Sequence, residues 1–227
     1  MITGWRSMVF AAVCAWALGL AGCHGYRGGM TELPTFGSQG GWARIESTDP
    51  NGSILNAKFD TAVYTSDGPN TMTILLVEGP LDNPRQAVTI HMFYLPISGY
   101  TPLDATATNS VVRYVVFSDD ASTDAKVGVY SGAGFVHPKQ TPGKKKVDVS
   151  AWNATLTLAD ASVGFNDVLG RSQFRGRFTL LKDNGATNDG VRKISQLVSE
   201  RLGYPRSVRA DDPQTPCDAT PSRLAAR

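Results

Sequence analysis

The sequence has few of the residues that most often carry chemistry. Three of its 227 residues are cysteine and three are histidine. No two cysteines have the spacing of a thiolate metal site, and no two histidines stand two or four residues apart, so a metal centre is not expected. No Gly-x-Ser-x-Gly segment occurs, so the nucleophile elbow of hydrolases is absent. No cofactor is expected on these grounds.

An excess of charge is also missing, since 22 basic side chains face 20 acidic ones. Removal of residues 1–22 would take away Arg6 and no acid, which leaves 21 bases against 20 acids. A nucleic-acid-binding domain usually carries a concentrated basic surface. This balance predicts no nucleic-acid partner.

The N-terminus has the pattern of an export signal. Arg6 is the only charged residue before residue 24, and an uncharged apolar run follows it from Met8 to Leu20. A positive start, a short apolar core and small residues after it are typical of a secretory signal. The run is shorter than the ~20 apolar residues of a membrane-spanning helix. Residues 1–22 are therefore predicted to be a signal peptide rather than part of the fold.

The end of this segment, Leu20-Ala21-Gly22-Cys23, resembles the lipobox of bacterial lipoproteins. The resemblance implies that the Cys23 thiol receives a diacylglycerol and that the chain is cut just before it. Two or more acyl chains hold a protein stably on a bilayer, whereas one does so only marginally. In that family an Asp after the cysteine favours the inner membrane, and here His24 stands there. The implied location is the outer membrane if the cell has one, and otherwise the cell surface.

A plain thiol at Cys23 is the alternative. Cys14 would leave with the signal, so Cys23 and Cys217 would then be the two cysteines able to pair. A secreted protein that depends on disulfides normally shows a larger, even set. Lipid on Cys23 remains the preferred interpretation.

The rest of the chain divides by composition into three parts. Residues 23–41 are glycine-rich and predict a flexible tether. Residues 204–227 contain four prolines and little apolar content, which predicts a disordered tail. Residues 42–203 are long enough to bury one core and form the predicted domain.

Alternating apolar and polar residues dominate this domain. The alternation is clearest over 86–95, 151–160 and 171–181, and residues 110–118 are apolar on both faces, as in a central strand. Further strands are expected over 43–47, 54–65, 72–78, 127–136 and 145–149. Short strands separated by Gly, Pro, Asn and Asp turns predict a mainly β fold, an antiparallel β-sandwich.

One segment near the end has helical periodicity instead. Its apolar residues are Val191, Ile194, Leu197, Val198 and Leu202. Asn188 or Asp189 is the expected N-cap, and Gly203 the expected end. We expect this single amphipathic helix to pack on a face or an open end of the sandwich.

Few side chains are candidates for catalysis. His91 shares a strand face with Thr89 and Phe93, which favours a packed or solvated histidine over a base. Asp60 and Glu78 could serve a two-carboxylate hydrolase only if the fold brings them together. The glycines of 131–134 indicate a bulge or bend. No catalytic residue is assigned.

Two acidic segments, 118–124 and 183–190, offer oxygens of the kind that calcium prefers. The same residues are the ordinary residues of turns, and neither segment fits the EF-hand pattern. No metal ligand is assigned. A calcium-stabilised adhesion module is kept as a third functional possibility.

Basic and aromatic side chains give weaker signals. Lys144–Lys146 are expected at a hairpin tip, where they would touch anionic lipid or, preferably, stay solvated and protect strand edges. Arg175, Arg177 and Arg113 would form a stripe only on adjacent strands. Trp42 is the one expected exposed tryptophan, because Trp152 falls on the apolar side of its strand.

The preferred function is a lipid-anchored cell-envelope protein with a non-catalytic binding or scaffolding domain. Its expected partners are the membrane, through lipid on Cys23, and an envelope polymer or protein. The alternative is a hydrolase of an envelope polymer whose active site is assembled only by the fold.

Overall fold

The computed structural model describes residues 39–50, 52–97, 99–101, 107–118 and 126–210. Residues 1–38 with Cys23, residues 211–227 with Cys217, and residues 119–124 of the first acidic segment lie outside this description. The described strands and helix are β1 Gly40–Ser47, β2 Ile54–Phe59, β3 Thr61–Thr65, β4 Met72–Glu78, β5 Gln86–Met92, β6 Ser110–Phe117, β7 Val127–Pro138, β8 Lys146–Ala161, β9 Ser172–Lys182 and α1 Asn184–Leu202.

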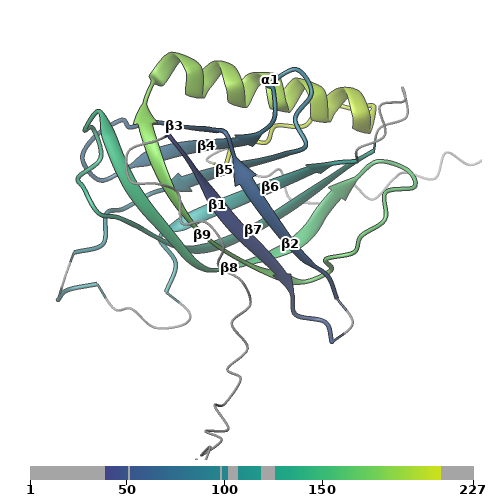
Figure 1. Ribbon diagram of the computed structural model, residues 1–227, viewed down its shortest axis with the longest axis horizontal. Coiled ribbons are helices and arrows are strands. Elements are labelled where there is room, and N and C mark those ends of the chain that lie inside the picture. The colour runs from purple at the N-terminus through teal and green to yellow at the C-terminus, as the bar shows by residue number, and fades with distance from the viewer. Residues whose placement is uncertain (1–38, 51, 98, 102–106, 119–125, 211–227) are drawn as a thin grey trace, which may run out of the picture. The chain divides into compact units, whose positions relative to one another are not determined.

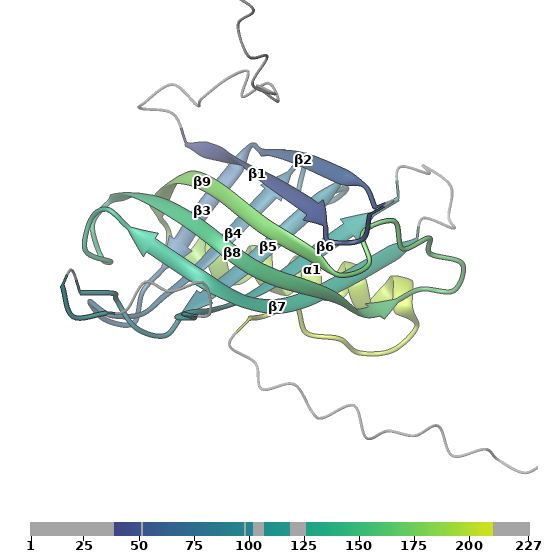
Figure 2. The ribbon, with the colours of Figure 1, turned by 90° about the horizontal axis from the view of Figure 1, so that it is seen from below.

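The nine strands form one sheet that curls into a ring (Figures 1 and 2). Their order is β2-β1-β9-β3-β4-β5-β6-β7-β8, and β8 pairs in addition with β9. The β3–β9 pair is parallel and the other pairs are antiparallel. A mainly β fold with one C-terminal helix is confirmed. The strands are not two plainly separate sheets, as a sandwich would require, because β9 has partners along both edges and closes the ring.

A break at Asp60 makes this closure possible. The sequence predicts one strand over 54–65, but the structure divides it into β2 and β3. The Asp60 amide donates to the Val77 carbonyl, and its carboxylate accepts from the Gly79 amide. The chain therefore changes partner, from β1 before Asp60 to β4 after it.

Side chains fill the ring and also pack on its outer face. Inside, Tyr64, Phe174 and Phe178 are among the largest fully buried residues. Outside, a second apolar cluster joins α1 to β3–β7, with Ile194 and Val198 packed among residues such as Val115. Figure 1 shows α1 lying along one side of the ring. Each such side chain stabilises the fold by about 1.5–3 kcal/mol when fully buried.

The helix begins earlier than the sequence predicts. Its N-cap is Asp183, whose carboxylate accepts from the Ala186 amide at 2.9 Å, so the predicted caps Asn188 and Asp189 were wrong. One of the two glycines that obscured this first part has a packing role, since a Cβ on Gly190 would lie 2.3 Å from Leu75. Gly203 ends the helix with φ 80°, as predicted. Among the described helices, none has the length and apolar character needed to cross a bilayer.

The chain after the helix stays on the protein. Residues 204–210, the start of the predicted tail, pack on the outer face of the sheet, where Val208 and Ala210 are buried. The Thr89 hydroxyl donates to the Val208 carbonyl, and Arg113 Nη1 donates to the Ser207 carbonyl at 2.8 Å. The packed unit therefore includes these residues as well as 42–203.

A bulge in β8 reverses the expected side of Trp152. The register with β9 shifts between Ala151 and Ala154, and Asn153 has a positive φ of 50°. Both alanines point into the core, so Trp152 is left 43% exposed, and its ring stacks on His137. The prediction that Trp152 lies on the apolar side was wrong because simple alternation does not survive a bulge.

The ring has two ends, which lie on the right and left of Figures 1 and 2. We call one end the mouth; it carries the β1–β2 turn at 48–53 and the loop 162–171 between β8 and β9. We call the other the lysine end; it carries the turns at 66–71 and 139–145 and the chain that follows β5.

Candidate binding pocket at the mouth of the ring

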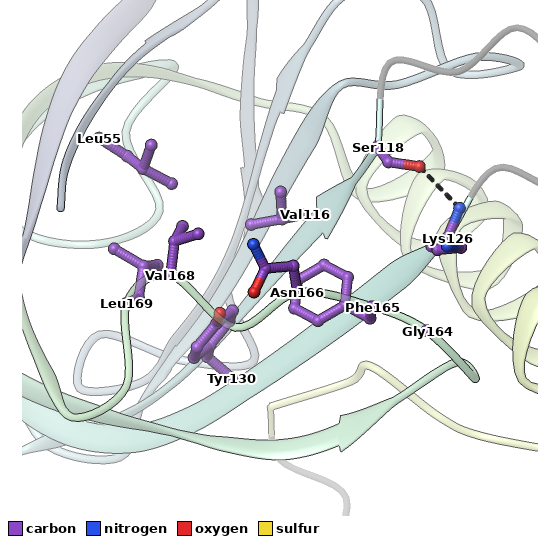
Figure 3. Close-up of a pocket in the computed structure, with 10 residues that line it drawn as sticks. All are labelled: Leu55, Val116, Ser118, Lys126, Tyr130, Gly164, Phe165, Asn166, Val168 and Leu169. Atoms are coloured by element: carbon purple, nitrogen blue, oxygen red, sulfur yellow. Dashed lines mark hydrogen bonds between the residues drawn. The ribbon is translucent and has the colours of Figure 1, made fainter. Parts of the chain in front are cut away.

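A pocket of about 390 Å³ opens at the mouth (Figure 3). Five side chains give it apolar walls, and four residues add polar groups or backbone. The apolar residues are Leu55, Val116, Phe165, Val168 and Leu169, and the others are Ser118, Lys126, Gly164 and Asn166, with Tyr130 at the floor. The pocket therefore combines an apolar body with a polar side.

The loop 162–171, here called the mouth loop, builds one wall of the pocket. Its Asp167 carboxylate accepts three hydrogen bonds through Oδ1: from the Tyr130 hydroxyl at 2.6 Å, from the Leu169 amide at 3.1 Å and from the Gly170 amide at 2.9 Å. Leu169 is 1% exposed and reaches into the core of the ring. The loop is thus fixed to β7 by polar and apolar contacts together.

The ring of Phe165 packs against Gly128, which has no side chain. A Cβ on Gly128 would lie 2.2 Å from the Phe165 ring, so the ring occupies the space that any larger residue would fill. The Phe165 amide donates to the Ser162 carbonyl, which holds the loop in a turn. Gly128 in β7 is therefore required for the mouth loop to fold over the ring.

A series of polar contacts leads from Arg85 and Glu78 towards Tyr130 at the floor of the pocket. Arg85 contacts Glu78 at 3.5 Å, the Gln86 amide donates to Glu78, and the Tyr114 hydroxyl donates to Gln86. The rings of Tyr114 and Tyr130 pack with centroids 5.9 Å apart. Hydrogen bonds therefore connect Glu78 to Tyr114, and ring packing continues the contacts to Tyr130, which holds the mouth loop.

Burial keeps both tyrosines protonated. Loss of hydration raises the pKa of Tyr130, and its hydrogen bond to Asp167 and the charge of Asp167 and Tyr114 raise it further. Burial also raises the pKa of Tyr114, with a smaller effect from the charge of Glu78. A phenol with a raised pKa remains a hydrogen-bond donor and is a poor base at neutral pH. These hydroxyls therefore support the structure.

The polar side of the pocket contains a cation. Lys126 is exposed, and its ammonium lies over Gly164, where an added Cβ would be 2.9 Å from Nζ. The Lys126 amide donates to Ser118 Oγ at 2.7 Å, and the Ser118 amide donates back to the Lys126 carbonyl. A side chain with a positive charge thus stands beside the apolar walls.

The residues first considered for catalysis each make a structural contact instead of forming one site. His91 Nδ1 contacts the Thr73 hydroxyl at 3.0 Å across two strands. Asp60 and Glu78 come near in the fold, but Asp60 binds the Gly79 amide and Glu78 is engaged by Arg85 and Gln86. Each carboxylate therefore has a structural partner.

The other candidates are also distributed over the surface. Arg175 pairs with Glu46 at 3.0 Å on the outer face, whereas Arg113 is 3% exposed beneath residues 204–210. Because β6 and β9 are not neighbours, the predicted stripe that joins Arg113 to Arg175 and Arg177 does not form. Trp42 is only partly exposed on β1.

The second acidic segment, 183–190, belongs to the start of α1. Asp183 caps the helix, and Asp189 pairs with Arg192 at 2.9 Å. Within the described ranges, no three His, Cys, Asp or Glu side chains gather as they would around a metal ion.

No motif in the sequence indicates the pocket. Gly164, Asn166 and Asp167 are ordinary turn residues. Tyr130 belongs to the predicted strand 127–136, where its side chain counts as one of the apolar residues. Only the closure of the ring brings β2, β6, β7 and the mouth loop together.

Comparison with protein-family models gives no match, and comparisons with curated proteins and with solved structures give none either. What can be said of the site therefore comes from its own residues.

Replacement of Tyr130 by Phe tests how the mouth loop is held. We expect a loss of about 1.5 kcal/mol in the free energy of unfolding, because Asp167 loses a charge-assisted hydrogen bond. Hydrogen exchange should become faster at the amides of Leu169 and Gly170. Since the folded pKa of Tyr130 is raised above its usual 10.0, the stabilisation is fully present below pH 10 and lost as the pH rises through the folded value.

The matched control is Tyr94→Phe, which removes an exposed hydrogen bond to the Thr108 carbonyl. Its effect should be below about 0.5 kcal/mol. Equal effects of the two substitutions would contradict the role given to Tyr130.

Proposed function

We propose that this chain is a lipid-anchored cell-envelope protein whose ring is a non-catalytic binding domain, with the mouth pocket as its binding site. The proposed binding role is supported by the pocket, in which apolar walls lie beside Lys126. Its volume falls within the range of roughly 300–1,000 Å³ that is usual for small-ligand sites.

The anchor rests on the sequence at Cys23. Residues 24–39 connect that cysteine to the first strand, and an extended chain spans at most about 3.5 Å per residue. The domain would therefore stand up to about 55 Å from the lipid. A tether of this length would leave the mouth accessible to ligands in the surrounding aqueous space.

The chemistry of the pocket favours an amphiphile. An alkyl chain would contact side chains such as Val116 and Phe165, and an anionic or acceptor group would meet Lys126. Tyr130 and Asp167 are bound to each other, which supports binding over catalysis. A medium-chain carboxylate such as decanoate is the simplest molecule with both features.

A titration of the compact unit Pro34–Arg227 with decanoate tests this proposal. We expect chemical-shift changes confined to the mouth. Val116→Phe should weaken binding by about tenfold, because the larger ring fills the pocket. Val111→Phe is the matched control, since Val111 lies on the same strand but on the opposite face, and it should bind normally. Lys126→Ala should weaken decanoate by about threefold and leave an uncharged analogue unaffected.

Two outcomes would change the conclusion. Equal affinity in the Val111 and Val116 variants would show that the ligand does not occupy the mouth. Turnover of a decanoate ester, lost in Val116→Phe, would favour the hydrolase instead of the binding protein.

A further inference from the structure

The lysine end of the ring carries a cluster of cations. Lys144 and Lys145 lie in the turn before β8, Lys146 begins that strand, and Lys182 ends β9. All four side chains are exposed. The Lys182 amide donates to the Lys145 carbonyl at 2.9 Å, so the cluster is continuous across two strands.

The backbone beneath these lysines is fixed. The hydroxyl of Tyr64, a fully buried residue, donates to the Lys144 carbonyl and accepts from the Gly143 amide at 3.1 Å. Burial raises the pKa of Tyr64, and the hydrogen bond from Gly143 lowers it by less. The lysines therefore project from a turn that is tied to the core of the ring.

The acidic side chains at this end do not offset the cluster. Asp148 accepts from the Thr179 hydroxyl at 2.8 Å and also from Gln140, and Asp183 caps α1. Asp67 lies in the turn between β3 and β4. Among the described residues of this end, the four lysines of the cluster outnumber these three aspartates, of which Asp148 and Asp183 are engaged in the fold.

Protection of a sheet edge does not account for these lysines. Lysine on an exposed strand edge prevents association with other sheets. However, β8 pairs with β9 from Lys146 onwards and with β7 from Val149 onwards, so it offers no long free edge to another sheet. The edge in the described sheet is β2, where Lys58 meets that need.

Exposed aromatic and aliphatic side chains occupy the same end. Phe93 and Tyr94 follow β5 and are 43% and 37% exposed, and Ile97 and Tyr100 are 60% and 86% exposed. Asn109 ties this segment to β7 through the carbonyls of Tyr94 and Val136. Tyrosine with lysine is the combination found where proteins meet the headgroups of a bilayer.

The chain also enters the fold from this side. Gly40, at the start of β1, pairs with Thr179, and Thr179 pairs on its other edge with Asp148. The Asp148 carbonyl accepts from the Lys139 amide at 2.8 Å. The segment that leads back to Cys23 therefore joins the ring two strands away from the lysine turn.

We infer that the lysine end is a docking surface for the headgroups of an anionic bilayer, so that the mouth faces away from the membrane. The inference deepens the proposed function, because it assigns the membrane a second contact besides the lipid on Cys23. Charge complementarity and the point of chain entry select this occupant over a protein partner.

Lysine footprinting tests the inference on the full native protein. The protein is placed in vesicles of phosphatidylcholine with or without phosphatidylglycerol and treated with an acetylating reagent, and each lysine is then quantified by mass spectrometry. In vesicles with phosphatidylglycerol we expect Lys144–Lys146 to react at least about threefold more slowly, with Lys126 and Lys193 unchanged. High salt should abolish the protection by screening the charges.

The double variant Lys144→Glu/Lys145→Glu should lose the protection of Lys146, whereas the matched Arg192→Glu/Lys193→Glu on α1 should retain it. If the parent protein stays fully with the vesicles but its lysines are acetylated equally fast at both ends of the ring, docking is overturned and the lipid anchor is still supported. Protection of the lysine end in a Cys23→Ala chain with excess vesicles would support docking without the anchor. If the parent protein neither stays with the vesicles nor shows protection of the lysine end, both the anchor and the docking are overturned.

Discussion

Replacement of Cys23 by Ala is expected to move the protein from the membrane fraction to the soluble fraction. A lipid with two or more acyl chains holds a protein stably on a bilayer. Among the described residues, no helix is long and apolar enough to replace it by crossing the membrane. Contacts of the lysine end would be weak and reversible by comparison. The measurement is the distribution of protein between fractions after a high-salt wash, with the mass of residue 23 in the parent protein as the direct check.

Two further cysteine variants make this experiment specific. Cys14→Ala removes a thiol from the predicted signal and should leave the membrane fraction unchanged. Cys217→Ala removes the other candidate for a disulfide with Cys23 and should also have no effect. If Cys23→Ala stays in the membrane after the wash, or if Cys23 in the parent carries no lipid, the anchor is disproved.

Replacement of Gly132 by Ala is expected to cause the largest loss of stability. A Cβ at this position would lie 1.7 Å from the Thr155 carbonyl oxygen of the paired strand β8. Backbone cannot move aside as a flexible side chain can, so β7 and β8 must separate. We expect a loss of about 3 kcal/mol in the free energy of unfolding. Denaturant unfolding of the unit Pro34–Arg227 measures it directly.

Gly68→Ala is the matched control, because an added Cβ there has no neighbour within 4 Å. Its effect should be within about 0.5 kcal/mol. A Gly132→Ala variant as stable as this control would mean that β7 and β8 do not approach as closely as described.

Local patterns predicted most strands because alternation and turn residues act over short distances. Met72–Glu78 begins and ends where its apolar run does, and β6 is the buried central strand that its residues indicate. Closure of the ring was not predictable, since it depends on β9 accepting partners along both edges. The bulge at Ala151–Ala154 was missed for a similar reason, because one irregular residue, Asn153, shifts the side of every later side chain.

The candidate site was less predictable than the fold. Its residues come from β2, β6, β7 and the mouth loop, and no motif joins them in the sequence. The contact of Tyr130 with Asp167 spans 37 residues and depends on the loop between β8 and β9 folding over β7. By contrast, the lysine turn was predicted at a hairpin tip, because Pro142-Gly143 marks a turn in any context.

The strand that completes the ring is also one of the last to be made. Glu46 and Arg175 are 129 residues apart in the chain and yet lie in contact on β1 and β9. Such distant pairings form slowly, because much of the chain must be ordered before they contribute. A polypeptide that emerges from its N-terminus cannot close the ring until nearly all of it has been synthesised. This delay would keep the nascent protein open, as the export that we propose for it would require during passage through a translocation channel.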